Sequence, residues 1–320
     1  MWKQCVTMAV VCVMFVSCAA EPELPAADSE SLAETPEDMP DVIVAERGGF
    51  VPEGVEYDTT NSRFLTGSLS EGSVFQIDPD GRVTALVNDP ELVSSIGIEA
   101  DEPRDRLLVA NSDRSVFGGD SAGQAKLGIY NLTTGERIAM VDLAAVIDEP
   151  PDDAVYFAND VAVVDDGTAY VTDTRMNLIY EVGLDYQASV FHQFEPMEGS
   201  SPNGIVPHPS GYLLVAGGTT LWKVPLEDPG RATQVTLPEE IPGQDGMVWT
   251  AEGRLAIVSN SDNRVVALTS TDDWATAQLA GVAAYGTQAT TAAVAGDDIY
   301  VVHPHLADAD PPSLERVVFE

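Results

Sequence analysis

Cysteine is nearly absent from this chain of 320 residues. The sequence contains three, Cys5, Cys12 and Cys18, and all lie near its beginning. The first two fall within a leader-like segment, and the third follows it directly. If that segment is removed and Cys18 carries lipid, the folded part has no free thiol. Disulfide bonds, thiolate metal ligands and cysteine nucleophiles are then excluded.

Positive charge is also scarce. Lys and Arg number 15 against 52 Asp and Glu, which gives a formal net charge of -37. Such a surface repels nucleic acid and anionic lipid headgroups, so we exclude DNA and RNA as partners. It favours solubility and attracts divalent cations diffusely.

Long apolar runs are missing beyond the N-terminus. A short basic start, Met1 to Lys3, is followed by an apolar run from Val6 to Val16 that is too short to span a bilayer. Phe15-Val16-Ser17-Cys18 then resembles a bacterial lipobox. We therefore expect residues 1–17 to be a lipoprotein signal peptide and Cys18 to be lipidated, with ordinary secretion as the alternative. This predicts an exported bacterial lipoprotein of the periplasm or cell surface that touches the membrane only through its lipid anchor.

The segment that follows has no aromatic residue. Residues 18–40 consist mainly of Glu, Asp, Pro, Ala and Ser, and such a composition cannot bury enough apolar surface to fold. We expect an acidic, disordered tether here and a folded domain over residues 41–320.

Helical periodicity is missing from this domain, whereas strand signals are frequent. Runs of Val, Ile, Leu, Tyr and Thr alternate with turn dipeptides such as DG, SG and TG. One two-strand phrase, as in SPNGIVPHPSGYLLVA, recurs six times, and its copies begin at Pro52, Ser95, Ala158, Ser201, Gln244 and Gln288. The copies start about 42 to 45 residues apart, with one interval of about 63, and most continue into a third and a fourth strand. This spacing predicts an all-β fold, a six-bladed β-propeller with four-stranded blades.

Two segments lie outside the repeats. Asp41 to Glu46, DVIVAE, precedes the first copy and has no partner there, so we expect it to close the last blade as its outer strand. Ser112 to Lys126 lengthens the second unit and is predicted to be a surface loop. It contains Gly119-Asp120-Ser121-Ala122-Gly123, which matches G-x-S-x-G, but a loop in an all-β chain lacks the strand-to-helix elbow that a serine nucleophile needs.

One position per repeat, at the start of the first strand, should lie at a mouth of the central channel. These mouth positions are Glu53, Ile96, Asn159, Asn203, Asp245 and Ala289. Two carboxylates and two amides that converge on one axis can bind a hard divalent cation. Ca²⁺ is expected first, then Mg²⁺ or Mn²⁺, and Zn²⁺ is less natural without histidine or thiolate. The alternative is that these residues only form turns, as Asn and Asp before glycine commonly do.

These phrases resemble the SMP-30/gluconolactonase-like family of six-bladed propeller lactonases, over about Asp41 to Glu320. The resemblance implies metal ligands at Glu53, at Asn203 in a PNG phrase and at Asp245 in a DGM phrase. It also implies that Asp245 is the catalytic group and that Asn159, in an ND phrase, contacts substrate. Family members that act on sugar acids have an arginine two residues before this asparagine, whereas this chain has Phe157. A more apolar lactone or ester is therefore expected, with Phe157 as a substrate contact.

Two functions follow from these patterns. The first is hydrolysis of a small-molecule lactone or ester by a monomer, in which one cation polarises the carbonyl and Asp245 acts as general base and acid. The second is a non-catalytic propeller that binds a peptide or polysaccharide at the cell surface, with a structural cation. A quinone-dependent oxidoreductase has no support, because no basic or histidine cluster marks a cofactor site. We expect the histidines of His303-Pro304-His305 to have mainly a structural or surface role, and His305 is also a candidate proton shuttle at the channel mouth.

Overall fold

The computed structural model of this protein describes residues 39–195, 201–306 and 310–320. The predicted signal peptide, the lipidation at Cys18 and residues 18–38 of the predicted tether lie outside these ranges and stay predictions. Within the described ranges, no helix has both the length and the apolar character needed to cross a bilayer.

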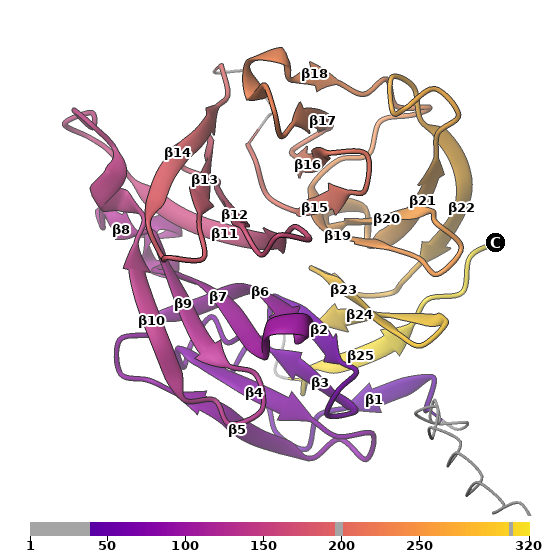
Figure 1. Cartoon of the computed structure of the whole chain (residues 1–320). Coiled ribbons are helices and arrows are strands. Elements are labelled where there is room, and N and C mark those ends of the chain that lie inside the picture. Colours follow the sequence, from indigo (N-terminus) through magenta and orange to yellow (C-terminus); the bar gives the residue numbers. More distant parts are fainter. Residues whose placement is uncertain (1–38, 196–200, 307–309) are drawn as a thin grey trace, which may run out of the picture. The chain divides into compact units, whose positions relative to one another are not determined.

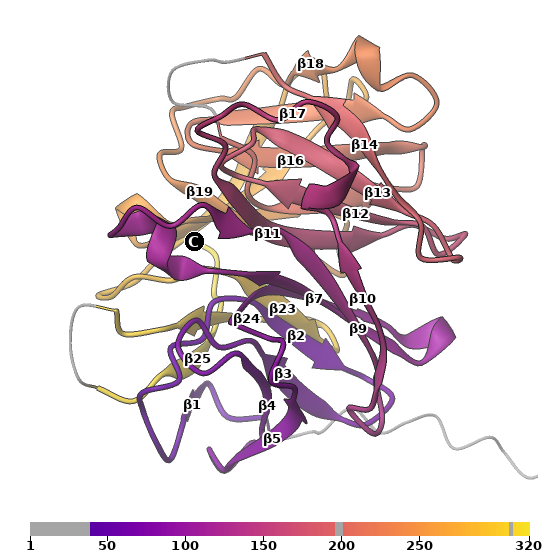
Figure 2. The ribbon, with the colours of Figure 1, turned by 90° about the vertical axis from the view of Figure 1, so that its left-hand side faces the viewer.

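Six antiparallel sheets, each built mainly from one run of chain, surround a common axis (Figure 1). The innermost strands contact one another in a closed series, β2 to β6, β11, β15, β19, β23 and back to β2. Figure 2 shows the ring from the side, with β9 and β10 next to the blade of β11 to β14. The all-β, six-bladed propeller predicted from the repeats is confirmed.

In chain order, and each from its inner to its outer strand, the blades are β2 (Val55–Asp58), β3 (Arg63–Thr66), β4 (Ser73–Ile77) and β5 (Val83–Asn88); β6 (Ser94–Asp101), β7 (Arg106–Ser112), β9 (Lys126–Asn131) and β10 (Arg137–Asp142); β11 (Tyr156–Val163), β12 (Ala169–Asp173), β13 (Leu178–Val182) and β14 (Ala188–Gln193); β15 (Ile205–His208), β16 (Tyr212–Gly217), β17 (Thr220–Pro225) and β18 (Thr233–Gln234); β19 (Gln244–Trp249), β20 (Leu255–Ser259), β21 (Arg264–Thr269) and β22 (Gln278–Ala284); β23 (Ala292–Ala295), β24 (Asp298–His303), β25 (Ser313–Arg316) and β1 (Val42–Val44). Short 3₁₀ helices lie in the connections: η1 (Glu102–Arg104), η2 (Arg114–Phe117), η3 (Ala144–Val146), η4 (Pro229–Arg231) and η5 (Asn260–Asp262).

Burial explains why the second strand of each blade is the most apolar. Strands β3, β7, β12, β16 and β20 are buried at every position, because neighbouring blades cover both of their faces. Outer strands such as β5 and β10 are mostly exposed or half-buried. The described residues form six apolar clusters, one between each pair of adjacent blades. The core is therefore a ring of blade interfaces.

The N-terminal strand closes the last blade, as predicted. β1 pairs antiparallel with β25, with Ile43 opposite Leu314. The Arg316 N–H donates to the Asp41 carbonyl at 2.8 Å, and the Tyr300 hydroxyl donates to the Pro40 carbonyl at 3.0 Å. Met39 and Pro40, the first residues that the structure describes, thus already contact the propeller just before the predicted domain boundary.

Two buried ion pairs link blades where the inner strands end. Asp58 is the last residue of β2, and Asp101 is the last residue of β6. Arg63 binds Asp58 at 2.9 Å and donates to the Leu132 carbonyl of the next blade. Arg106 binds Asp101 at 2.5 Å and donates to the Gly167 carbonyl of the blade after that, at 3.0 Å. Both pairs have the same spacing in their repeats, so each serves as a polar link between consecutive blades.

The segment predicted as a surface loop has more structure than expected. Within Ser112 to Lys126 lies η2, and the short strand β8 (Gly123–Gln124) pairs parallel with β11, which gives that blade a fifth strand. Val116 and Ala125 are buried against the blade interface and anchor the segment. The Ser121 hydroxyl donates to Asp113 Oδ2 at 3.0 Å, and the segment forms no strand-to-helix elbow.

The closure can be tested at Ile43, which is 1% exposed and packs with Tyr300 and Leu314. Ile43→Ala should lower the free energy of unfolding by about 2 kcal/mol or more, because it leaves a cavity beside the closing strand. The matched control is Val44→Ala, at a position 54% exposed on the same strand, which should change little. Urea unfolding of both variants makes the measurement. Equal stability of the two would show that β1 does not hold the ring closed.

Candidate active site at the channel mouth

The backbones of neighbouring inner strands approach closely where these strands begin. In four blades the residue after the mouth position is glycine: Gly54, Gly97, Gly204 and Gly246. A Cβ atom on Gly54 would lie 2.5 Å from the Ile96 carbonyl oxygen, and one on Gly204 would lie 2.2 Å from that of Asp245. Real Cβ atoms do not approach so closely, so glycine is required here. The approach brings the mouth positions of adjacent blades together.

The two blades without this glycine use side-chain hydrogen bonds. Asp160 occupies the place of the glycine in the third blade, and its Oδ2 accepts the Ile205 N–H of the next blade at 3.1 Å. Thr290 occupies it in the last blade, and its hydroxyl donates to the Glu53 carbonyl at 2.8 Å. The ring of contacts at the mouth therefore continues around these blades.

The structure places the predicted site residues at the equivalent position of their blades. Asn159 and Asp245 are 5% and 7% exposed, whereas Glu53 and Asn203 are half-buried. Ile96 and Ala289 are fully buried apolar residues. The mouth therefore carries oxygen ligands on four blades and apolar groups on two.

Two oxygen atoms of the mouth residues are buried without a hydrogen-bond partner among the described residues, and so are the side-chain oxygens of Ser95 and Gln244, which precede Ile96 and Asp245. Asp245 accepts the Asn260 amide through Oδ2 at 2.9 Å; its Oδ1 makes no hydrogen bond of normal geometry, although the Asn203 amide lies close enough to lower the pKa of this carboxyl group. Asn159 donates through Nδ2 to the Thr174 hydroxyl at 2.7 Å, and its Oδ1 also has no partner. A buried acceptor without a donor is unfavourable, so each of these atoms is open to a bond from a water, an ion or a substrate.

The carboxylates of the channel raise one another's pKa. Burial raises the pKa of Glu53 well above its usual range, and the nearby Asp245 and Asp160 raise it further. Burial raises the pKa of Asp245 to about 7, against the lowering effect of the Asn203 and Asn260 amides. Repulsion from Asp245 is thus the main contribution to the raised pKa of Glu53 after burial itself.

Sequence reasoning missed three acidic residues that line the channel. Burial raises the pKa of Asp160 to about 7 and that of Glu99 to about 8, with Asp160 adding repulsion. Glu56 has a strongly raised pKa for the same reasons, with Glu99 as its main repelling neighbour. The signal was present in the repeats, because Glu56 and Glu99 each lie three residues after a mouth position, in EGVE and IGIE.

A further layer of residues holds Asp245 in place. Asn260 donates to Asp245 Oδ2, and its own Oδ1 accepts a hydrogen bond from the Gln288 side chain. The Gln288 carbonyl lies 3.0 Å from Nδ1 of His303, a histidine 1% exposed whose pKa is lowered by burial. These contacts leave Asp245 Oδ1 as the oxygen available to a ligand.

Phe157 does not face open space in this structure. It is 3% exposed and packs in the cluster between the second and third blades. The exposed ring of Phe117 covers it edge-on, with centroids 4.8 Å apart. A substrate that approaches from this side would meet Phe117 first.

The donor set of the mouth fits a hard cation that takes amide as well as carboxylate oxygens. No cluster of three or more His, Cys, Asp or Glu side chains with metal-binding geometry occurs in the described part of the chain. A cation at the mouth would therefore depend on the amide oxygens of Asn159 and Asn203 together with Glu53 and Asp245. Such mixed oxygen sets are typical of Ca²⁺ sites.

Comparison with known proteins supports the fold. No protein-family model matches the sequence, and no curated protein matches it. Among solved structures, the chain is similar to the major allergen Mala s 1 of Malassezia sympodialis, with a TM-score of 0.72 and 20% identity over 88% of this chain and 97% of the allergen. It is also similar to a luciferin-regenerating enzyme, with a TM-score of 0.61 and 14% identity over 87% of this chain and 94% of the enzyme.

A third similar structure is that of a candidate gluconolactonase. Its TM-score is 0.59 and its identity 16%, over 87% of this chain and 93% of the other. At such identities the likeness establishes the propeller fold, while an activity has to be argued from this chain's own site.

The buried channel acids should make the metal-free protein less stable as pH rises. The pKa of Glu99 is raised from 4.5 to about 8, so the folded protein binds this proton more tightly than the unfolded chain. The resulting stabilisation is complete below pH 4.5 and is lost as pH rises to about 8. Thermal unfolding in EDTA at several pH values from 4.5 to 8 measures the slope of the melting temperature against pH.

Glu99→Gln should make this slope shallower, because it removes one of the titrating groups. The control is Glu136→Gln, at an exposed glutamate on the turn between β9 and β10, which should leave the slope unchanged. An identical slope in wild type and Glu99→Gln would contradict the assignment of Glu99 as a protonated channel acid.

Proposed function

We propose that this protein is a metal-dependent hydrolase that opens a lactone or related ester at the channel mouth. The observation that carries the proposal is the pair of buried, unpartnered oxygens at one ring of the propeller, Asn159 Oδ1 and Asp245 Oδ1. They come from two separate blades, and Glu53 and Asn203 supply further oxygens at the same level of the repeats.

In this proposal Glu53, Asn203 and Asp245 hold one divalent cation, and Asn159 contacts the substrate or a water beside it. Ca²⁺ fits the mixed oxygen set best, ahead of Mg²⁺, Mn²⁺ and Zn²⁺. When bound, such a cation polarises the carbonyl and stabilises negative charge that develops on its oxygen.

Asp245 would move the proton in this reaction. Its carboxylate would take a proton from the water that attacks the carbonyl carbon, and return it to the ring or ester oxygen as the carbon–oxygen bond breaks. A general base works best when its pKa is near the working pH. Burial favours this role, because it raises the pKa of Asp245 to about 7 in the metal-free protein.

The proposal places the chain with the SMP-30/gluconolactonase-like family. The PNG, DGM and ND phrases support it, and so does the structural likeness to a candidate gluconolactonase. Phe157, where sugar-acid hydrolases of the family have arginine, favours an apolar substrate. We further propose an exported lipoprotein that acts as a monomer at the periplasmic or outer surface.

Metal binding is tested at Glu53. The purified protein should bind about one divalent ion per chain, and Glu53→Gln should bind far less, because one of two carboxylate ligands is lost. Calorimetric titration with Ca²⁺, Mg²⁺, Mn²⁺ and Zn²⁺, together with elemental analysis, measures this. Glu136→Gln serves as the control with the same change of charge. A metal-free wild type, or unchanged binding by Glu53→Gln, would overturn the site.

Catalysis is tested at Asp245 with a panel of lactones and aryl esters. Asp245→Asn should lower kcat by about 10²- to 10⁴-fold, because the amide cannot accept the proton from water. Metal content is measured on the same sample, so that loss of the cation is distinguished from loss of the base. Full activity in Asp245→Asn would disprove the catalytic role. Metal binding without turnover of any panel member would favour the alternative, a binding propeller with a structural cation.

A further inference from the structure

Arg114 differs from most arginines of this acidic protein. Arg47, Arg82, Arg137 and Arg264, for example, each form an ion pair with a nearby carboxylate. The Arg114 guanidinium forms no hydrogen bond or ion pair with any residue in the described ranges; only its backbone N–H is used, as donor to the Ser94 hydroxyl at 3.3 Å. Its positive charge is therefore available to a ligand.

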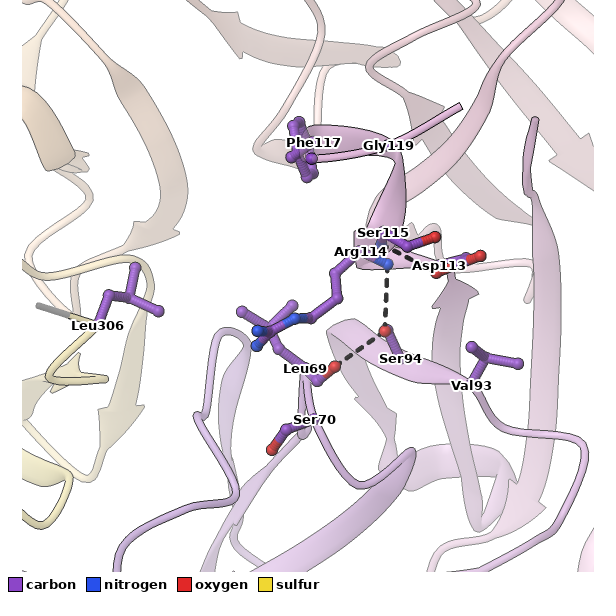
Figure 3. A pocket seen from close by; sticks show the side chains of 11 residues that line it. Leu69, Ser70, Val93, Ser94, Asp113, Arg114, Ser115, Phe117, Gly119 and Leu306 are labelled. Carbon is purple, nitrogen blue, oxygen red and sulfur yellow. Dashed lines mark hydrogen bonds between the residues drawn. The ribbon is translucent and has the colours of Figure 1, made fainter. Parts of the chain in front are cut away.

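This side chain lies in a cavity of about 830 Å³ on the face where the inner strands begin. Four connections form its wall: the loop after β3 (Leu69, Ser70), the entry to β6 (Val93, Ser94), the segment around η2, and the loop after β24 (Leu306). Figure 3 shows the Arg114 side chain directed into the space between Leu69 and Leu306. The guanidinium thus projects into the cavity.

The rest of the wall is largely apolar. Val93, Phe117 and Leu306 are 47%, 62% and 49% exposed, and all three belong to the cavity. They are among the few large hydrophobic side chains that the folded domain leaves exposed. Exposed apolar residues that gather in a concave site, together with a few polar groups, are typical of small-molecule pockets. The polar groups of this wall are Arg114, Asp113 and three serines, Ser70, Ser94 and Ser115.

Asp113 also lines this wall, and both oxygens of its carboxylate accept hydrogen bonds from nearby residues. Its Oδ1 accepts the Ser115 N–H at 2.9 Å, and its Oδ2 accepts the Ser121 hydroxyl at 3.0 Å. These bonds hold its pKa below the usual range. The carboxylate therefore caps η2 and supports the loop, and it makes no ion pair with Arg114.

The cavity borders the proposed active site. Ser94 lies two residues before the mouth position Ile96 on β6. Phe117 covers Phe157, which lies two residues before Asn159 on β11. A molecule that reacts at the mouth can therefore extend into the cavity between these two blades.

We propose that this cavity binds an apolar arm of the substrate that ends in a carboxylate. Arg114 would pair with the carboxylate, and Leu69, Val93, Phe117 and Leu306 would cover the hydrocarbon portion. The inference rests on the proposed hydrolysis for the reacting end and names its substrate class, lactones or esters with an anionic amphiphilic side chain. A guanidinium binds a carboxylate through two parallel hydrogen bonds, which makes the contact specific.

The net charge of -37 does not prevent this binding. At physiological salt, charges more than about 8 Å apart are largely screened. Direct contact with Arg114 therefore outweighs the distant carboxylates of the surface.

Binding is tested with octanoate and with 1-octanol as its uncharged counterpart. Calorimetry is done in EDTA, because a cation at the mouth would itself attract the carboxylate. Arg114→Gln should weaken octanoate binding about 10- to 100-fold, the usual effect of a lost charged hydrogen bond, and should change octanol binding less than about twofold. Arg114→Lys should restore part of the affinity, since it keeps the charge without the bidentate geometry.

The matched control is Arg231→Gln, which removes an exposed arginine on η4 in another blade. It should leave octanoate binding unchanged. Equal octanoate affinity in wild type and Arg114→Gln would overturn the inference, and so would an equal loss in Arg231→Gln.

Measuring the rate of ester hydrolysis tests the substrate class and the proposed hydrolase activity separately. For two esters that differ only by a terminal carboxylate, Arg114→Gln should lower kcat/KM for the acid about 10- to 100-fold and leave the neutral ester unchanged. If both esters are hydrolysed and Arg114→Gln treats them alike, the substrate class is wrong and the hydrolase stands. If neither is hydrolysed but octanoate binding depends on Arg114, the hydrolase is wrong and the anion pocket stands.

Discussion

The close approach of neighbouring inner strands at the channel mouth is the constraint on which the rest of this structure depends. Gly54, Gly97 and Gly204 lie so near the next blade's backbone that any side chain would collide with it. Each glycine follows a mouth position directly, so the same approach that tightens the ring also brings Glu53, Asn203 and Asp245 toward one axis. The close approach of the inner strands therefore determines both how the blades pack and where the mouth residues lie. A larger residue at one of these glycines would move the neighbouring blades apart, and the mouth residues with them.

This geometry has an electrostatic consequence. Burial and repulsion between carboxylates of different blades raise the pKa of Glu53, Glu56, Glu99 and Asp245. Their charge must be neutralised by protons or by cations. In the proposed function a cation does this at the mouth, and protons do it deeper in the channel. The strongly acidic composition adds a general attraction for cations around the whole molecule.

The propeller is symmetric in outline, but its mouth is not. Two blades contribute the buried apolar Ile96 and Ala289, and one contributes Asp160 in place of glycine. The segment between β7 and β9 adds η2 and β8 on one side only, and with them Arg114 and Phe117. In the proposed function, a symmetric ring would supply only the cation site. The segment between β7 and β9 adds the proposed pocket on one side of the mouth. A pocket on one side only can fix the orientation of a bound ligand.

The sequence by itself determined the number of blades, the strand that closes the ring and the residues at the mouth. Each of these depends on a local pattern repeated at a fixed period, and β1 was predictable because DVIVAE had no partner in its own unit. Only the tertiary structure shows which oxygens lack partners. Asn260 and Thr174 both lie fifteen residues after their mouth positions, but their hydrogen bonds to Asp245 and Asn159 depend on how the side chains are oriented. The tertiary structure also decided that Phe157 is covered by Phe117 and that Arg114 has no ion-pair partner among the described residues. Contacts between distant segments are set by how blades pack, and a one-dimensional pattern does not contain that information.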